Sequence, residues 1–252
     1  MRAFRMNQAD TLLVIPSYRD GKRLIEFLPP LCAALKANLG QVRIQVVVDG
    51  SPESEQRWLA AKIAELRGDY PSLQPMQSYP QNRGKGHAIR AGWATAPQAA
   101  WLAFVDADGA TPPTEVAALI AQAQAAQQPA LFMGVRTAAT NKSVTRFWHR
   151  RIGSSVFNRW VRLCLGLKFA DTQCGLKIIP RAFYASSVWR EAGFAFDLEL
   201  LLRARAAGLP VIARPISWCE RPGSSLSPPA MLALFAAAYR LRQNLPHPPT
   251  GP

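Results

Sequence analysis

The sequence predicts an α/β fold with a Rossmann-like, mostly parallel central sheet covered by helices on both faces. Three observations predict this fold. Short β-branched runs alternate with segments of helical periodicity through the first half of the chain. The runs at 11–15 and 101–105 are apolar or β-branched throughout, which is typical of parallel strands buried on both faces. Polar or glycine-rich residues follow the predicted strands, where open α/β sheets bind ligands.

The first predicted unit is strand, helix, strand. The run 11–15 ends at Pro16, the run 42–48 ends at Asp49, and the segment 22–39 between them carries leucines at helical spacing. The same signals give the next elements in chain order. They are a helix at 52–66 with Ser51 as N-cap and Pro52 at its first position, a strand at 73–77, a helix at 85–96, a strand at 101–105, a helix at 112–127 and a strand at 130–135.

The composition changes after residue 136. No acidic residue occurs between Val116 and Ala170, whereas the segment 136–168 is strongly basic. We predict a helix at 144–165, strands at 176–179 and 209–216 around a helix at 196–207, and a last helix that opens with Pro228-Pro229.

The charge of the chain favours polyanionic partners. Lys and Arg number 30 and Asp and Glu number 16, for a formal net charge of +14. A hydrophobic content of 49% excludes a disordered chain. The four cysteines lack metal-ligand spacing, so we expect reduced thiols, and we expect neither a signal peptide nor a membrane-spanning helix.

The strongest local motif is Asp106-Ala107-Asp108, which directly follows the strand at 101–105. Two carboxylates one residue apart at a bend can converge on a hard divalent cation such as Mg²⁺ or Mn²⁺. The alternative is a solvated turn, because Asp and Gly favour turns in any case. The motif alone does not decide between them.

Two further strand ends carry candidate ligand groups. Residues 82–86, which include Gly84, Lys85 and Gly86, resemble a phosphate-cradling loop that leads into a helix. The loop lacks the Walker spacing, and the first strand is not followed by G-x-G-x-x-G. Asp49 could accept hydrogen bonds from a nucleobase, or be an ordinary turn residue.

Taken together, these motifs resemble family 2 glycosyltransferases of the GT-A (nucleotide-diphospho-sugar transferase) fold. The resemblance rests on VIPSYRD, VVVDGSPES, NRGKGHAIRAG, FVDADGATPP and GVR, in this order over residues 11–136. In the second half, DTQCGLK, FDLELL and WCE followed by GSSL resemble dolichyl-phosphate β-glucosyltransferases and polyprenyl-phosphate glycosyltransferases. We therefore expect one domain at 1–227, with a donor and metal half at 11–136 and an acceptor half at 137–227. A helix and a proline-rich tail follow at 228–252.

The resemblance implies inverting transfer of a sugar from a nucleotide sugar to the phosphate of a polyprenol. Glucose from UDP-glucose is the implied donor, and UDP-N-acetylglucosamine or GDP-mannose fits the same motifs. Donor binding is implied for a set of strand-end residues: Pro16, Tyr18, Asp49, Gly84, Lys85, Gly86 and Asp106. Asp106 and Asp108 would hold Mg²⁺ or Mn²⁺.

The implied acceptor-phosphate site consists of Arg136, Arg150 and Ser154, with Arg151 as the alternative to Arg150. A phosphate is already an anion at pH 7, so the reaction needs positive charge more than a strong base. Asp197 stands where related transferases carry a catalytic carboxylate, and it can instead position a substrate. Its alternative is a helix-start aspartate stabilised by the helix dipole.

We expect a cytoplasmic protein, peripheral to the cytoplasmic face of the membrane, because the implied acceptor is a lipid. The basic segment 136–168, with Phe147, Trp148, Phe157 and Trp160, would lie on anionic lipid, or a membrane partner protein would supply the contact. The alternative is a solvated basic face with its aromatics in the core.

Two other functions compete. A soluble hydroxyl acceptor, as in polysaccharide synthesis, would need a general base near the acceptor oxygen. A nucleic-acid-binding module would use the positive charge, but it leaves Asp106 and Asp108 unexplained, so we expect no nucleic acid partner.

Overall fold

The computed structural model describes residues 10–38, 41–136, 144–145, 148–219, 221 and 228–244, and of residues 37–38, 144–145, 148–156, 228–232 and 244 it describes only the backbone. The strands are β1 (Thr11–Ser17), β2 (Val42–Asp49), β3 (Gln77–Tyr79), β4 (Trp101–Val105), β5 (Leu131–Val135), β6 (Val144–Thr145), β7 (Leu176–Pro180), β8 (Val211–Pro215) and β9 (Trp218–Cys219). The helices are α1 (Gly21–Asn38), α2 (Glu53–Asp69), α3 (Lys85–Ala94), α4 (Pro113–Gln124), α5 (Trp148–Leu165), α6 (Arg181–Ala185), α7 (Phe196–Ala206) and α8 (Pro228–Asn244).

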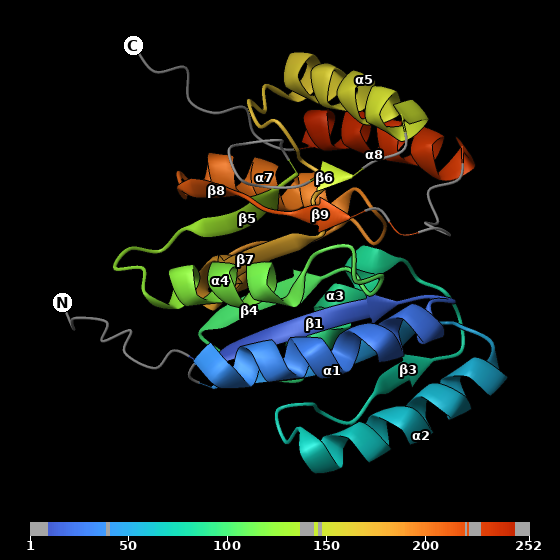
Figure 1. Cartoon of the computed structure of the whole chain (residues 1–252). Helices are drawn as coiled ribbons and strands as arrows, with labels where there is room; N and C mark the ends of the chain where they lie inside the picture. Colours follow the sequence, from blue (N-terminus) through green and yellow to red (C-terminus); the bar gives the residue numbers. More distant parts are fainter. Residues whose placement is uncertain are drawn as a thin grey trace.

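Seven of these strands form one sheet in the order β3-β2-β1-β4-β7-β5-β8 (Figure 1). All neighbouring pairs are parallel except those of β7, which runs antiparallel to β4 and β5. The predicted α/β class with a mostly parallel sheet is therefore confirmed. β6 and β9 form a separate short parallel pair.

The sheet is buried on both faces, and alternate residues of β1 belong to different hydrophobic cores. Leu13 and Ile15 pack with apolar side chains of α1, α2 and α4. Leu12 and Val14 pack with α3 and α7, and the core on this face continues to α5 and α8. A strand covered on both sides needs apolar residues at every position, which explains the continuous apolar run at 11–15.

The reversed direction of β7 brings its preceding loop to the ligand-binding edge. The chain enters β7 beside the carboxyl ends of β4 and β5, because an antiparallel strand begins where its neighbours end. The backbone N–H of Asp106, just after β4, donates to the carbonyl oxygen of Gly175, just before β7, at 3.1 Å. Residues 171–175 therefore lie next to the carboxylates that follow β4.

Two predicted boundaries are wrong for identifiable reasons. The strand predicted at 73–77 is reduced to an isolated bridge between Leu73 and Ile44, and β3 begins only at Gln77. Pro75 has no N–H, so it interrupts the ladder. Pro52 is the N-cap of α2 rather than its first residue. The hydroxyl of Ser51 does not cap the helix, and accepts the backbone N–H of Arg19 at 2.8 Å.

The helix predicted at 144–165 starts later than expected. Residues 144–145 form β6, and α5 begins at Trp148. The five-residue helix α6 was not predicted, because one turn and a half shows no periodicity. All four cysteines are free, as expected.

The contact between α5 and α8 corrects the expectation that the aromatic residues of the basic segment face lipid. Phe157 is buried, and its ring centroid lies 5.1 Å from that of Phe235 on α8. Trp160 is half-buried, 5.0 Å from the same ring. Phe147 and the side chain of Trp148 lie outside the described residues. Within the described part of the chain, no helix combines the length and apolarity needed to span a bilayer.

Candidate active site

Lys85 brings three predicted site residues together at the carboxyl edge of the sheet. Its ammonium nitrogen lies 2.9 Å from Oδ1 of Asp106 and 3.1 Å from Oδ2 of Asp197. Lys85 is the first residue of α3, Asp106 directly follows β4, and Asp197 lies in the first turn of α7. The topology thus joins residues more than a hundred positions apart into one charged cluster.

The glycines around Lys85 allow a second loop to cover this turn. Gly84 has a φ of +98°, and a Cβ there would lie 2.5 Å from the carbonyl oxygen of Ala192. At Gly86 a Cβ would lie 2.6 Å from Cβ of Phe196. The backbone N–H of His87 also donates to the Ala192 oxygen, at 2.9 Å. Only glycine fits at 84 and 86, so the loop that precedes α7 fixes the start of α3.

Asp49 organises the loop that leads to Lys85. Its two carboxylate oxygens accept the backbone N–H groups of Arg83, at 2.7 Å, and Gly84, at 2.8 Å. The side-chain amide of Asn82 donates to the Asp49 carbonyl oxygen at 3.2 Å. The buried carboxylate therefore orders the predicted phosphate-binding loop, and nucleobase binding by Asp49 stays a prediction.

The carboxylates of Asp106 and Asp108 have different electrostatic surroundings. Burial and the neighbouring Asp106 carboxylate raise the pKa of Asp108, although its Oδ1 accepts the Ala110 N–H at 2.9 Å. Burial and the charges of Glu55 and Asp106 raise the pKa of Asp20 too. At Asp106 burial acts in the same direction, but the Lys85 ammonium outweighs it and lowers the pKa.

This donor set fits a hard divalent cation that shares its ligands with substrate. The carboxylates are the oxygen ligands that hard cations prefer, and a bound cation would offset the burial and the Asp106 charge that raise the pKa of Asp108. No group of three His, Cys, Asp or Glu side chains that could hold a metal occurs among the described residues. Mg²⁺ in particular is commonly held by one or two carboxylates together with substrate phosphates.

Both carboxylate oxygens of Asp197 are engaged by lysines. Oδ2 contacts Lys85, and Oδ1 contacts the ammonium of Lys177 on β7. The Asp197 side chain is only 1% exposed. Both oxygens are therefore already occupied, so Asp197 could accept a proton from a substrate hydroxyl only if one of these contacts were broken.

Arg136 is held by Asp171 in a two-pronged ion pair. Nε lies 2.6 Å from Oδ2 and Nη2 lies 2.9 Å from Oδ1, while the Arg136 backbone N–H donates to Oδ2 at 3.1 Å. The guanidinium lies over the ring of Trp218, 5.1 Å from its centroid. Burial opposes its charge, but Asp171 prevails and raises the pKa of Arg136. The arginine is therefore a fixed cation near Asp106, whose pKa it helps to lower.

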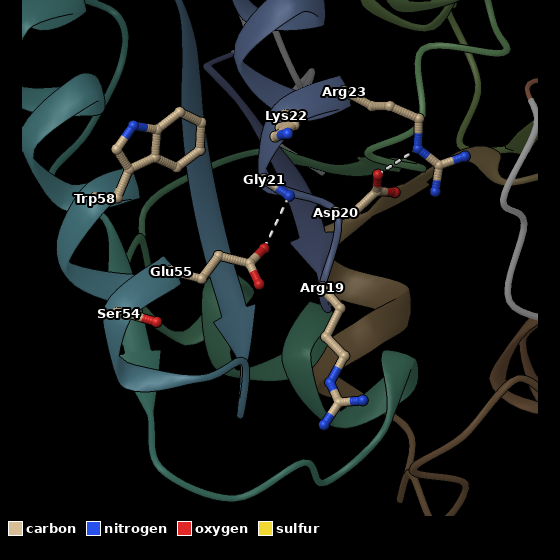
Figure 2. A pocket seen from close by; sticks show the side chains of 8 residues that line it. All are labelled: Arg19, Asp20, Gly21, Lys22, Arg23, Ser54, Glu55 and Trp58. Carbon is tan, nitrogen blue, oxygen red and sulfur yellow. Dashed lines mark hydrogen bonds and ion pairs between the residues drawn. The ribbon is translucent and has the colours of Figure 1, made fainter.

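Two hollows flank Arg19, which follows the predicted donor residues Pro16 and Tyr18. The first, of about 610 Å³, lies between the starts of α1 and α2. Figure 2 shows its interior contacts: the Gly21 N–H donates to Glu55, and Asp20 pairs with Arg23. The second, of about 470 Å³, is lined by Arg19, by the turn between β2 and α2 with the start of α2, and by the end of β3. The ring of Tyr18 is 40% exposed.

The structure leaves some predicted residues untested and adds others. The side chains of Arg150 and Ser154 lie outside the described part of α5. Asp171, Gly175 and Lys177 were not predicted as site residues. Two signals could have found them: Asp171 is the first acidic residue after a long basic segment, and Lys177 interrupts the apolar strand L-K-I-I-P.

Known proteins share both sequence and fold with this chain. The sequence model described as Glycosyl transferase family 2 matches residues 12–186. Dolichyl-phosphate β-glucosyltransferase of Saccharomyces cerevisiae is 28% identical over 85% of this chain and 68% of the yeast protein. Polyprenol monophosphomannose synthase of Mycolicibacterium smegmatis is 28% identical over 84% of this chain and 78% of that protein.

A solved structure shows the same fold. It is glucosyl-3-phosphoglycerate synthase of Mycobacterium tuberculosis in complex with Mn²⁺, UDP and phosphoglyceric acid. Its TM-score is 0.64 at 14% identity, with 95% of this chain and 80% of that chain covered. This agreement confirms the predicted GT-A fold.

Proposed function

Since the chain belongs to glycosyl transferase family 2, we propose that it transfers a sugar from a nucleotide sugar to the phosphate of a polyprenol, with inversion at the anomeric carbon. The relatives named above act on dolichyl phosphate and on a polyprenol phosphate. The single observation that carries the choice of acceptor is the pairing of Asp197 with two lysines. A carboxylate neutralised in this way suits an acceptor that needs no deprotonation.

The proposed site for the metal and the donor diphosphate consists of Lys85, Asp106 and Asp108. Asp106 and Asp108 would hold Mg²⁺ or Mn²⁺, which neutralises charge on the departing nucleoside diphosphate. Lys85 already points its ammonium at Asp106 and would contact the same diphosphate. UDP-glucose is the proposed donor, since most of the similar curated relatives are β-glucosyltransferases.

The nucleoside is proposed to occupy the hollow of about 470 Å³ between the ends of β2 and β3. Gly50, Ser51 and Tyr79 line this hollow, next to the loop that Asp49 holds in place. The exposed Tyr18 ring on the adjoining strand end is suited to stack on a base.

The proposed acceptor-phosphate site is built around Arg136. Asp171 orients the guanidinium, so its fork is fixed before the acceptor binds. A guanidinium suits phosphate because it is a permanent cation that carries five N–H donors in one plane, and only part of this set is used by Asp171. Arg150 and Ser154 complete the proposed acceptor-phosphate site. No step in this scheme needs a proton to be taken from the acceptor.

A lipid substrate requires contact with a membrane. We propose that the solvent-exposed residues of α5 and α8 make this contact. The exposed described residues there include four arginines and two large hydrophobic side chains: Arg159, Arg162, Leu163, Tyr239, Arg240 and Arg242. Cations beside apolar groups are typical of surfaces that bind anionic lipid headgroups. We propose that the contact is made with the cytoplasmic face of the membrane. In the alternative, a membrane partner protein supplies it.

The test is a transfer assay with the purified full chain, Mn²⁺ or Mg²⁺, polyprenyl phosphate and radiolabelled UDP-glucose, UDP-N-acetylglucosamine or GDP-mannose. We expect one donor to give label that extracts into organic solvent, and we expect EDTA or Asp108→Ala to abolish it. Hydrolysis or binding of a donor without extractable label would contradict the lipid acceptor and favour a soluble hydroxyl acceptor.

A further inference from the structure

Lys177 is a lysine in the interior of the sheet that the proposed reaction does not use. It lies on β7, which is paired on both sides with β4 and β5 (Figure 1), and its side chain is completely buried. Burying a charged amine is costly unless it is paired and hydrogen-bonded. Its ammonium meets this condition, since it donates to the carbonyl oxygens of Thr172, at 3.2 Å, and Cys174, at 2.7 Å, and to Asp197.

Four groups of alternating charge connect this buried lysine to the proposed metal site. Lys177 contacts Oδ1 of Asp197, Oδ2 of Asp197 contacts Lys85, and Lys85 contacts Asp106. Exposure rises along the series: the side chains are 0%, 1%, 10% and 43% exposed. The ring of Phe104 lies beside both lysines, 5.8 Å from Lys177 and 5.2 Å from Lys85, and excludes other partners on that side.

The arrangement creates a competition for Lys85. Asp197 is a buried carboxylate, and such a group needs full compensation of its charge. With Lys177 present, Asp197 shares Lys85 with Asp106. Without the charge of Lys177, Lys85 would be the remaining lysine partner of Asp197, so the attraction would draw its ammonium inward, away from Asp106 and from a bound diphosphate.

We propose that Lys177 is a positioning residue of the donor site: it neutralises Asp197 so that Lys85 remains available to Asp106 and to the donor diphosphate. This inference rests on the proposed function for the identity of the ligand. According to this proposal, Asp197 holds the ammonium of Lys85 in place, and neither Asp197 nor Lys177 touches the reacting atoms.

The competition predicts an unusual order of affinities. Lys177→Met leaves Asp197 to capture Lys85 and gives the weakest donor binding. The double variant Lys177→Met with Asp197→Asn removes the capturing charge and restores part of the affinity, although Lys85 has then lost its anchor. Replacing both members of a buried ion pair by neutral residues also leaves no unpaired charge, so the double variant should fold.

The experiment is calorimetric titration of the full chain with UDP and with GDP in the presence of Mn²⁺, supported by thermal melting. We expect Lys177→Met to bind the preferred nucleotide at least about tenfold more weakly than wild type (about 1.4 kcal/mol), with the double variant between them. Lys62→Met serves as the matched control, because Lys62 pairs with Glu65 on the exposed surface of α2. It should bind like wild type.

The possible results support or overturn the proposed role of Lys177 as follows. Wild-type affinity in Lys177→Met, or a double variant that binds no better than Lys177→Met, would overturn the inference. If Lys177→Met does not fold, the double variant decides alone: binding several-fold weaker than wild type supports the inference, and equal binding overturns it. If wild type binds neither nucleotide, the proposed function fails instead.

Discussion

Gly175→Ala is expected to inactivate the proposed donor site while leaving the fold nearly intact. A Cβ at this position would lie 1.8 Å from Oδ2 of Asp106, 2.1 Å from its Cγ and 2.6 Å from its Oδ1. Ordinary contact begins at 3.4 Å. The added methyl group therefore excludes the whole Asp106 carboxylate from its present position, and with it the 2.9 Å contact to Lys85.

The effects on activity and stability should differ in size. The three nearest atoms all belong to one short side chain that can rotate away, so overpacking should cost only about 1 kcal/mol. For a chain of this length that is a fall in Tm of about 2–4 °C. If Asp106 binds the metal as proposed, displacing its carboxylate by roughly 1 Å or more should lower kcat/KM by about 10²-fold.

The assay compares transfer activity, Mn²⁺-dependent UDP binding and Tm in Gly175→Ala and in Gly68→Ala. Gly68 lies in α2 with no atom within 4 Å of its added Cβ, so the same substitution there should stabilise the helix by about 0.5–1 kcal/mol and leave activity unchanged. A Gly175→Ala protein that keeps wild-type activity and nucleotide affinity would refute the assignment of Asp106 to the donor site.

Three further predictions concern the acceptor, the glycine turn and the buried thiols. Asp171→Asn removes the carboxylate that orients Arg136 and should raise KM for polyprenyl phosphate about tenfold, as steady-state kinetics would show; an unchanged KM would contradict the role of Arg136. Gly84→Ala, at a φ of +98°, should lower both Tm and UDP affinity by calorimetry, and a neutral effect on both would be inconsistent with the described turn. Burial raises the pKa of the Cys32 and Cys174 thiols from 9.0 to about 11, so the unfolded chain releases these protons first. The free energy of unfolding should therefore be unaffected by these thiols below pH 9 and fall between pH 9 and 11, and urea unfolding should show a smaller fall when both are replaced by alanine.

Strand identity was predictable wherever burial on both faces left a continuous apolar run. The run at 101–105 coincides with β4, and the polar residues after β1, β2 and β4 meet at one edge, because parallel strands share an orientation. The direction of β7 was not predictable, because a short apolar strand carries no local mark of its orientation. Because the direction of β7 was not predicted, the contact between Gly175 and Asp106 was not predicted either.

The role of Asp197 shows a second limit of sequence reasoning. Its position at a helix start allowed a catalytic carboxylate or a partner of the helix dipole. The structure places Asp197 in the first turn of α7 and shows in addition that each of its carboxylate oxygens contacts a lysine from a different element. Such pairing depends on three segments that meet only after folding, so no spacing in the sequence reports it.

The charges of the site explain why a divalent cation should be required. Among the described residues, the charged side chains of the proposed site are four carboxylates and three cations: Asp106, Asp108, Asp171, Asp197, Lys85, Lys177 and Arg136. This set carries no excess of positive charge, and the proposed acceptor residue Arg150 would only balance it, although both proposed substrates are phosphates. One divalent ion at Asp106 and Asp108 would make the sum positive, so the diphosphate and the acceptor phosphate could then approach each other. The antiparallel strand β7 supplies the loop that spaces these charges, since Asp171 holds Arg136, Gly175 makes room for Asp106, and Lys177 neutralises Asp197.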